Sequence, residues 1–484
     1  MNKSLKSKAI KGLSWSLADK LINQLGSLAV TLYLARLIGP ESFGFIGMLT
    51  IFIRLFESVV NGGFTQALVQ RSKDITEEDS STIFYVNMLW GVFIYGALYF
   101  AAPLIADFYK QPLLVDISRV LFLVVIINSF SIVARAKLTI AIDFKSQSIA
   151  STIATVFGSA IAIYLALLDY GYWALVWLVL SKALFNSMGL WFFCKWLPKL
   201  IFSMKSFKSL FKFGSNLMIA GLVATFVNNL YVALVGRYFS ATSVGYFTHA
   251  TNLTNALSGV VSSTLQGVTY PIMTSIKDDK ERLTNIYKQL ISITMLVSLP
   301  LFVGFAAVAE SFVNIFLGNE WIATIPLLIA LSFARVITPI SAINMNILNA
   351  VGRSDLFLKV DLSKLPMTLA ALFIALPFGI EALAWSMACT SAIAFFINAY
   401  YPYKLFDFGP IKQLKIALNY IIASGVMYLV LMFVDIGSGI FELVLKIGLG
   451  VLVYVLFLWI IKDEYFMKIV GEVMGKINFR KRFT

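Results

Sequence analysis

The sequence predicts an all-α protein that crosses a membrane many times, and three observations support this fold class. Of its 484 residues, 59% are apolar and only 13% are charged, whereas an ordinary soluble domain has roughly a quarter charged residues. The mean hydropathy is +0.84. Long apolar runs also recur along the whole chain. A soluble protein of this composition could not cover its core with the few polar residues that it has.

The composition also excludes several other classes of protein. A chain this apolar is neither intrinsically disordered nor a coiled coil, and its two cysteines, Cys194 and Cys389, cannot build a disulfide scaffold. A membrane β-barrel is excluded because the apolar runs are long and do not alternate with polar residues. A bundle of transmembrane helices is the class that remains.

A helix that crosses the bilayer needs about 20 mostly apolar residues, and fourteen segments meet this requirement. They are residues 12–37, 43–69, 82–106, 117–142, 148–168, 172–193, 214–237, 244–273, 285–308, 322–350, 359–378, 382–403, 416–434 and 439–461. One helix with its loop then takes about 35 residues, which suits spans of about 20 to 25 residues joined by short loops.

Lysine and arginine are unequally distributed between the two sides of these spans. The net charge of +14 comes from 39 basic and 25 acidic residues. Most basic residues lie on one side, in the N-terminal segment, in the connection 194–213 and in the C-terminal tail. The opposite connections, such as 38–42 and 169–171, are short and almost uncharged. The positive-inside rule makes the basic side cytoplasmic. Both termini are then cytoplasmic, which requires an even number of spans and supports fourteen.

The expected domain organisation is two six-helix bundles, residues 1–193 and 214–403, followed by two extra helices and a basic tail in residues 404–484. Residues 194–213 between the bundles are basic and amphipathic. They either lie along the anionic inner surface of the membrane or form a solvated linker.

A short motif recurs in the two halves. The end of the first span reads ARLIGPESFGF and the end of the seventh reads VGRYFSATSVGY. Aligning Arg36 with Arg237 also aligns Gly44 with Gly245. Both copies are entered from the cytoplasm, so the repeat is parallel. Transporters built from paired halves commonly hold their substrate between them near the midplane of the bilayer.

Charged residues in the middle of a span are candidate functional residues, because each costs about 2.5–3.5 kcal/mol at the bilayer centre. Arg54 and Glu57 lie about halfway along the second span and on one helical face. Lys182 lies near the middle of the sixth span and Arg335 near the middle of the tenth. The alternative is a structural role for each, with Arg54 and Glu57 as an ion pair.

Three of these four midspan charges are basic, which suits an anionic passenger better than a cation or a neutral sugar. Arginine binds a diphosphate through paired hydrogen bonds, and lysine attracts it as a point charge. Asp19 and Lys20, nearer the cytoplasmic side of the first span, extend the candidate site. Lys20 is expected to bind substrate, whereas Asp19 and Glu57 are expected to couple an ion or to form ion pairs.

The motifs of several enzyme classes are missing from the sequence. It has no Walker A motif, no GxSxG motif and no His/Cys cluster with metal-ligand spacing. A single histidine makes a Ser/His/Asp triad implausible. We therefore expect a protein that is not an enzyme and that has no cofactor, no metal and no nucleic-acid partner.

Several segments carry a family resemblance. LARLIGPESFGFIGM resembles the signature opening of bacterial polysaccharide exporters of the multidrug/oligosaccharidyl-lipid/polysaccharide superfamily. YPIMTSIKDDKERLTNIYKQL (270–290) and FVNIFLGNEWIATIPLLIAL (312–331) look like the same family, close to colanic acid and O-antigen repeat-unit exporters. RLFESVVNGGFTQALV (54–69) is similar to the lipid II flippase branch.

The resemblance implies a V-shaped pair of six-helix bundles that works by alternating access. Such a protein moves an undecaprenyl-pyrophosphate-linked oligosaccharide across the bacterial inner membrane, coupled to H+ or Na+, with membrane lipids and polysaccharide assembly proteins as further partners. Of the family's functional residues only Arg54 is carried over, at the position of an arginine that faces the central cavity and binds pyrophosphate. The first-span arginines of the lipid II branch have no match, since Asp19 and Lys20 occupy that region.

The leading hypothesis is a flippase for the repeat unit of a surface polysaccharide such as O-antigen, colanic acid-like polymer or capsule. Arg54, Lys182 and Arg335 would neutralise the diphosphate, and Glu57 would pair with Arg54 or carry the coupling ion. Three alternatives remain, one of which is a lipid-scrambling or purely structural role. A drug or cation antiporter of the same fold requires acidic residues at the midplane, and a membrane-embedded polysaccharide polymerase or ligase requires a large outer loop.

Overall fold

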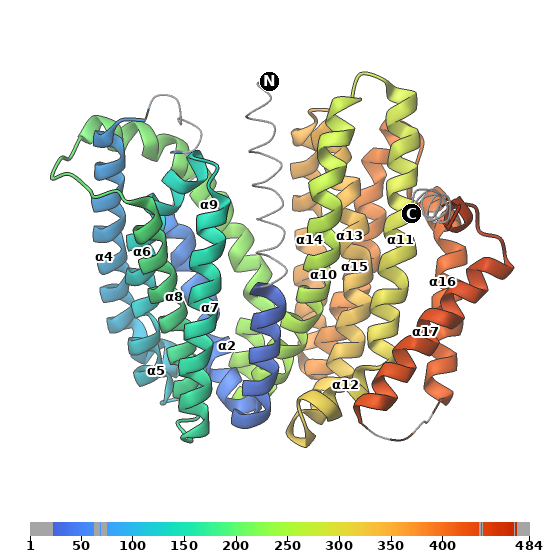
Figure 1. Cartoon of the computed structure of the whole chain (residues 1–484), viewed down its shortest axis with the longest axis horizontal. Coiled ribbons are helices and arrows are strands. Elements are labelled where there is room, and N and C mark those ends of the chain that lie inside the picture. The colour runs from blue at the N-terminus through green and yellow to red at the C-terminus, as the bar shows by residue number, and fades with distance from the viewer. Residues whose placement is uncertain are drawn as a thin grey trace, which may run out of the picture. The chain divides into compact units, whose positions relative to one another are not determined.

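The computed structural model describes residues 23–61, 68, 75–434, 437, 439–468 and 470–471. Within these residues every regular element is a helix (Figure 1). Eleven of the helical segments are long and apolar enough to cross a membrane. The all-α membrane fold is therefore confirmed, whereas the count of fourteen spans stays a prediction.

The chain divides into two compact units, Met1–Thr248 and His249–Thr484. Unit 1 contains helical residues 23–38 and seven further helices. They are α2 (Pro40–Asn61), α4 (Glu77–Tyr109), α5 (Leu114–Leu121), α6 (Leu123–Ile140), α7 (Phe144–Leu167), α8 (Tyr172–Cys194) and α9 (Met204–Tyr238). It also includes the first residues of α10 (Ala241–Ser275), up to Thr248.

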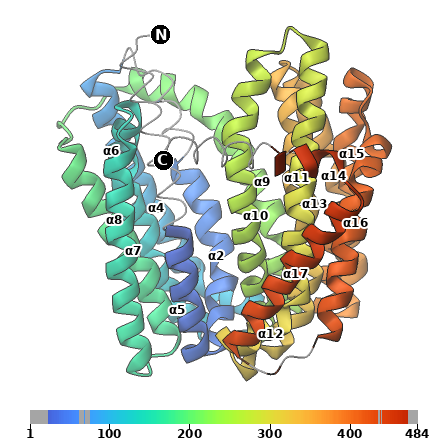
Figure 2. The same cartoon turned by 45° about the vertical axis from the view of Figure 1, so that its right-hand side comes forward.

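Unit 2 contains the remainder of α10 and the helices that follow it. They are α11 (Lys280–Ala307), α12 (Ala309–Phe316), η1 (Asn319–Thr324), α13 (Ile325–Ala350), α14 (Ser354–Ala375), η2 (Leu376–Phe378), α15 (Ile380–Phe406), α16 (Pro410–Phe433) and α17 (Ile440–Ile460). Within this unit, α16 packs against both α11 and α17. Figure 2 shows this side of unit 2 turned towards the viewer.

The boundary between the units differs from the expected division at residues 194–213. The helix α9 packs against α2 and α4 and so belongs to unit 1. The segment 194–213 is also not one linker, because residues 195–203 are non-helical and α9 begins at Met204. The division into two six-helix bundles stays a prediction.

Local sequence signals account for where several helices begin. Thr76 and Asp79 form a reciprocal capping box at the start of α4, which satisfies two backbone N–H groups that the helix itself leaves unpaired. Asp143, Ser203 and Asp279 accept hydrogen bonds from backbone N–H groups in the first turns of α7, α9 and α11. These caps fix helix ends at the polar edges of the apolar segments.

The two glycines aligned by the repeat lie against each other's helices. A Cβ atom added to Gly44 of α2 would lie 1.8 Å from the carbonyl oxygen of Ala241. One added to Gly245 of α10 would lie 1.9 Å from the carbonyl oxygen of Pro40. Pro40 and Ala241 each precede their own glycine by four residues. The contact is therefore reciprocal, and it requires residues without a side chain at both positions.

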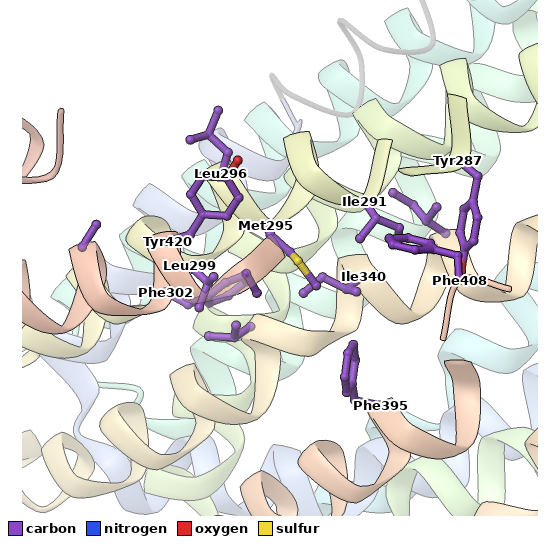
Figure 3. Packing of buried hydrophobic residues seen from close by; sticks show 14 of the residues in the cluster. Tyr287, Ile291, Met295, Leu296, Leu299, Phe302, Ile340, Phe395, Phe408 and Tyr420 are labelled. Carbon is purple, nitrogen blue, oxygen red and sulfur yellow. The ribbon is translucent and has the colours of Figure 1, made fainter. Parts of the chain in front are cut away.

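The core of unit 2 is a continuous apolar cluster that joins α11, α13, α15 and α16 (Figure 3). Ile291, Met295 and Phe302 of α11 belong to this cluster, together with Ile340 of α13. A buried polar group lies in the same unit. The amide of Gln413 on α16 donates to Tyr287 Oη at 3.0 Å, and Tyr287 Oη donates to Asn344 Oδ1 on α13. These hydrogen bonds connect α11, α13 and α16 to one another.

Candidate functional site

Arg54 and Glu57 lie one helical turn apart on α2, as their spacing predicts. Glu57 is half-buried, and its carboxylate accepts a hydrogen bond from Asn128 Nδ2 of α6 at 2.5 Å. Arg54 is exposed. The carboxylate is therefore held by a neutral amide from another helix and not by the arginine beside it.

A second arginine approaches the same carboxylate. Arg135 lies on α6 seven residues after Asn128, which is two turns further along the same helical face. Arg54 and Arg135 both lie close enough to interact electrostatically with Glu57. Neither arginine forms an ion pair within 4.0 Å with any residue that the structure describes. The cluster thus contains two guanidinium groups with unused hydrogen-bond donors and one carboxylate.

Lys182 lies in unit 1 on α8, where its ammonium group donates to Ser27 Oγ at 2.9 Å. Its stem packs on Gly158 of α7, where an added Cβ would lie 2.6 Å from Lys182 Cγ. No carboxylate within the described ranges pairs with Lys182. Its charge is consequently not neutralised by the residues around it.

Helical residues 23–38 are joined to α7 as well as to α8. Asn23 Nδ2 donates to Ser151 Oγ at 3.0 Å and to Thr152 Oγ1 at 3.5 Å. Together with the bond from Lys182 to Ser27, these contacts hold the first helix in unit 1 through neutral oxygen atoms. Lys182 is therefore bonded to a neutral hydroxyl group and not to a carboxylate.

Arg335 lies in unit 2, in the first half of α13, and is half-buried. Its Nε atom is buried and has no hydrogen-bond partner in the described part of the chain. An unsatisfied buried donor is costly, and a charged one more so. Arg335 would therefore gain from an anionic partner.

Two of the predicted site residues, Asp19 and Lys20, lie outside the described residues. The structure brings Arg54 and Glu57 together and places Lys182 in the same unit. Arg335 belongs to unit 2. Nothing in the structure tests the roles assigned to these residues, and the roles stay predictions.

Three features of these helices are not apparent from the sequence. Asn128 carries no sequence signal, because an asparagine in an apolar run gives no indication of its partner. Arg135 lies within the predicted span 117–142, but nothing in the sequence shows that it approaches Glu57. In unit 2, Lys364 on α14 pairs with Asp361 at 2.7 Å and donates to Asn398 of α15 at 3.2 Å. Lys364 lies within the predicted span 359–378, so its position in the sequence indicates a charge in the membrane.

Among the described residues, no three His, Cys, Asp or Glu side chains lie together so that they could hold a metal ion. The charged groups of unit 1 described above are the guanidinium groups of Arg54 and Arg135, the ammonium group of Lys182 and the carboxylate of Glu57.

The family assignment rests on a match over most of the chain. Residues 33–326 match the model of the polysaccharide biosynthesis protein family. The chain belongs to this family. The match includes all of the helices from α2 to α12, and therefore Arg54, Glu57, Asn128, Arg135 and Lys182.

Two curated members of the polysaccharide biosynthesis group are similar to this chain. Teichuronic acid biosynthesis protein TuaB of Bacillus subtilis is 27% identical over 355 residues, which cover 72% of each protein. Succinoglycan biosynthesis transport protein ExoT of Rhizobium meliloti is 24% identical over 456 residues, 92% of this chain and 91% of ExoT. The resemblance to polysaccharide exporters is thereby confirmed.

Two solved structures share the fold of this polysaccharide biosynthesis protein. The lipid II flippase MurJ in an inward closed conformation matches with a TM-score of 0.75 at 17% identity, covering 93% of this chain and 98% of MurJ. An inward-facing multidrug resistance MATE transporter of the MOP superfamily matches with a TM-score of 0.63 at 16% identity, covering 87% and 98%. Both likenesses concern the fold.

Proposed function

We propose that this protein is a flippase that moves a polyprenyl-pyrophosphate-linked oligosaccharide repeat unit from the cytoplasmic to the outer leaflet during surface polysaccharide assembly. The lipid carrier is undecaprenyl pyrophosphate, and transport proceeds by alternating access coupled to H+ or Na+. Family membership, the transport protein ExoT and the flippase fold of MurJ support this proposal.

One observation carries the assignment of the substrate. Arg54 and Arg135 flank Glu57, yet Asn128 and not an arginine binds the carboxylate. Each guanidinium therefore keeps donors for the two phosphates of a pyrophosphate, which it can bind through paired hydrogen bonds. Lys182 adds a positive charge in the same unit. Arg335 is the predicted substrate-binding residue of unit 2.

Glu57 is the candidate ion-coupling residue. While it is negatively charged, the carboxylate of Glu57 attracts both Arg54 and Arg135. This attraction weakens when the carboxylate binds a cation. When H+ or Na+ binds to Glu57, both arginines can bind the pyrophosphate. When the cation is released, the negative carboxylate competes with the pyrophosphate for the same arginines. Asp19 and Lys20 would extend this cluster at the cytoplasmic side.

The protein lies in the bacterial inner membrane with both termini in the cytoplasm. Lysine and arginine are concentrated in the N-terminal segment, in the connection 194–213 and in the C-terminal tail, which supports this orientation through the positive-inside rule. Substrate then enters from the side on which sugar nucleotides are made and leaves towards polysaccharide assembly proteins. The protein itself makes or breaks no covalent bond in this process.

The test is the substitution Arg54→Ala, with Arg54→Lys beside it. A charge-assisted hydrogen bond contributes about 1.5–3 kcal/mol, so we expect transport to fall about 10- to 100-fold. Lysine keeps the charge but loses the paired geometry, so partial activity should remain. The measurement is the amount of surface polysaccharide at equal protein abundance, together with the lipid-linked repeat unit that accumulates inside the cell.

The matched control is Arg282→Ala, which removes an exposed arginine near the start of α11. It should leave polysaccharide export unchanged. Undiminished export by Arg54→Ala would contradict the role of Arg54. Drug or ethidium efflux by the wild-type protein, lost in Glu57→Gln and retained in Arg54→Ala, would instead support the cation antiporter.

A further inference from the structure

A short segment at one end of unit 1 is held in a defined position without being helical. We call residues 195–203 the strap. It begins where α8 ends at Cys194, with Lys195 in a left-handed conformation (φ 49°). It ends at Ser203, which caps α9. In Figure 1 the strap is the green loop at the edge of unit 1, beside one end of α4.

Three hydrogen bonds attach the strap to the start of α4. The backbone N–H of Lys199 donates to Ser81 Oγ at 3.0 Å, and that of Ser203 donates to Thr82 Oγ1 at 2.9 Å. Trp196 Nε1 donates to Glu77 Oε2 at 2.7 Å. Because the backbone is fixed from within, the strap presents a constant set of side chains to its surroundings.

The side chains that the strap presents are strongly apolar. Leu200 is 95% exposed and Leu197 is 78% exposed. Ile201 and Phe202 are also exposed, as is Met204 at the start of α9. Exposed apolar residues scattered singly are ordinary, but a contiguous set of five marks an interaction surface.

Lysines are interleaved with these apolar side chains. Lys199 in the strap and Lys205 and Lys208 in the first turns of α9 are exposed. None of them forms an ion pair with a described residue. Apolar side chains with unpaired lysines among them are complementary to the surface of an anionic membrane, where acyl chains lie beneath negative headgroups.

Aromatic rings indicate that the strap lies at the level of the headgroups. Trp191 of α8 stacks on Trp196 of the strap at 5.9 Å between ring centroids, and both contact Phe84 of α4. Tryptophan is concentrated at the interface between membrane and water. The strap also begins directly after the candidate span Tyr172–Cys194. Its exposed leucines therefore need no deep insertion to reach the acyl chains.

We infer that the strap and the first turns of α9 form an interfacial anchor that binds anionic phospholipid of the inner leaflet. The inference rests on the cytoplasmic orientation proposed above for this end of unit 1. The anchor holds the end of α4 at the membrane surface through Leu197 and Leu200, with Lys199, Lys205 and Lys208 on phosphate groups. Transport should consequently depend on the anionic lipid content of the membrane.

The test uses the full-length protein with Cys194→Ser and Cys389→Ser, and with Leu200→Cys labelled by an environment-sensitive fluorophore. The protein is reconstituted in phosphatidylcholine alone or in equal parts of phosphatidylcholine and phosphatidylglycerol. Quenching by lipids with a spin label on the acyl chain reports insertion. We expect strong quenching in the anionic membrane and several-fold weaker quenching in phosphatidylcholine. The label at Asp278→Cys, in an exposed polar loop, should be quenched in neither.

The charge contribution is tested with the triple variant Lys199→Gln, Lys205→Gln and Lys208→Gln. Each lysine near an anionic surface strengthens binding about fivefold. The labelled triple variant should therefore be quenched in both membranes only as weakly as the protein with all three lysines is quenched in phosphatidylcholine. The matched control, Lys277→Gln with Lys280→Gln and Arg282→Gln, removes three exposed charges elsewhere and should behave as wild type.

Three results would overturn the anchor. Equal quenching in both membranes would exclude specificity for anionic lipid, and absence of quenching in both would exclude insertion. Protection of Leu200→Cys by a co-purifying protein in detergent would assign the surface to a protein partner. Labelling of Leu200→Cys from outside intact cells would instead refute the proposed orientation while leaving insertion itself measurable.

Discussion

The hydrogen bond between Asn128 and Glu57 holds a carboxylate that lies near Arg54 and Arg135. Arg54 lies one turn from Glu57 on the same helix, a spacing at which an ion pair commonly forms. Instead, Asn128 Nδ2 donates a hydrogen bond to the carboxylate at 2.5 Å. A neutral donor thus binds the carboxylate where an ion pair could form, and Arg54 forms no ion pair with a described residue. Under the proposed function this leaves the guanidinium group for the pyrophosphate.

The substitution Asn128→Ala tests this contact. It removes the neutral donor, so Glu57 should turn to Arg54 or Arg135 and compete with the pyrophosphate. A hydrogen bond to a charged group is worth about 1.5–3 kcal/mol, so we expect transport to fall at least about tenfold. The measurement is export of polysaccharide at equal protein abundance.

A double variant separates this competition from a loss of folding. Adding Glu57→Gln to Asn128→Ala removes the competing carboxylate and should restore substrate binding, measured with a pyrophosphate-bearing lipid. The two residues would then show a strong non-additive interaction. Additive losses in the double variant would show that Asn128 acts independently of Glu57.

Among the helices, the crossing of α2 and α10 has the least tolerance for change. Gly44 and Gly245 each lie so close to a backbone carbonyl of the other helix that an added Cβ atom would overlap with it. Side chains can move away from an added methyl group, but a helix backbone cannot do so without shifting the whole element. Small residues at such crossings let transmembrane helices pack closely.

We expect Gly44→Ala and Gly245→Ala to destabilise the protein, since overpacking typically costs about 1–3 kcal/mol. The melting temperature of the purified protein, measured by size exclusion after heating, should fall by several degrees for either variant. Gly96→Ala in α4 and Gly425→Ala in α16 are matched controls, because an added Cβ meets no neighbouring atom at either position. A melting temperature equal to that of the controls would contradict the close crossing.

For the whole molecule, the distribution of lysine and arginine is the feature that decides orientation. The connections on one side carry most of the lysine and arginine, whereas those on the other side are short and almost uncharged. This asymmetry acts during membrane insertion, when positively charged loops are retained in the cytoplasm. Orientation then determines from which leaflet the substrate enters.

Cysteine labelling of intact cells measures this orientation. In a background of Cys194→Ser and Cys389→Ser, Ser240→Cys lies in the connection between α9 and α10, and Asp278→Cys lies between α10 and α11. We expect a membrane-impermeant maleimide to label Ser240→Cys in intact cells and Asp278→Cys only after permeabilisation. Labelling in the reverse order would place both termini outside the cytoplasm.

Hydropathy and charge along the chain are enough to predict the membrane fold, and a few sequence segments carry the family resemblance. The helices confirm the fold and the family match confirms the resemblance. Hydropathy and charge also identify Arg54, Glu57 and Lys182 as charges in the middle of apolar segments. These features can be read locally, because the cost of placing a residue in the bilayer depends mainly on that residue and its depth.

The partners of these charges depend on contacts between distant segments and cannot be read locally. Glu57 and Asn128 are 71 residues apart, and Lys182 and Ser27 are 155 residues apart. Which side chain meets a given charge depends on helix rotation and crossing, and these are set by packing along the whole helix. The same reason accounts for α9, whose place in unit 1 follows from its contacts with α2 and α4 and not from its position after the basic segment.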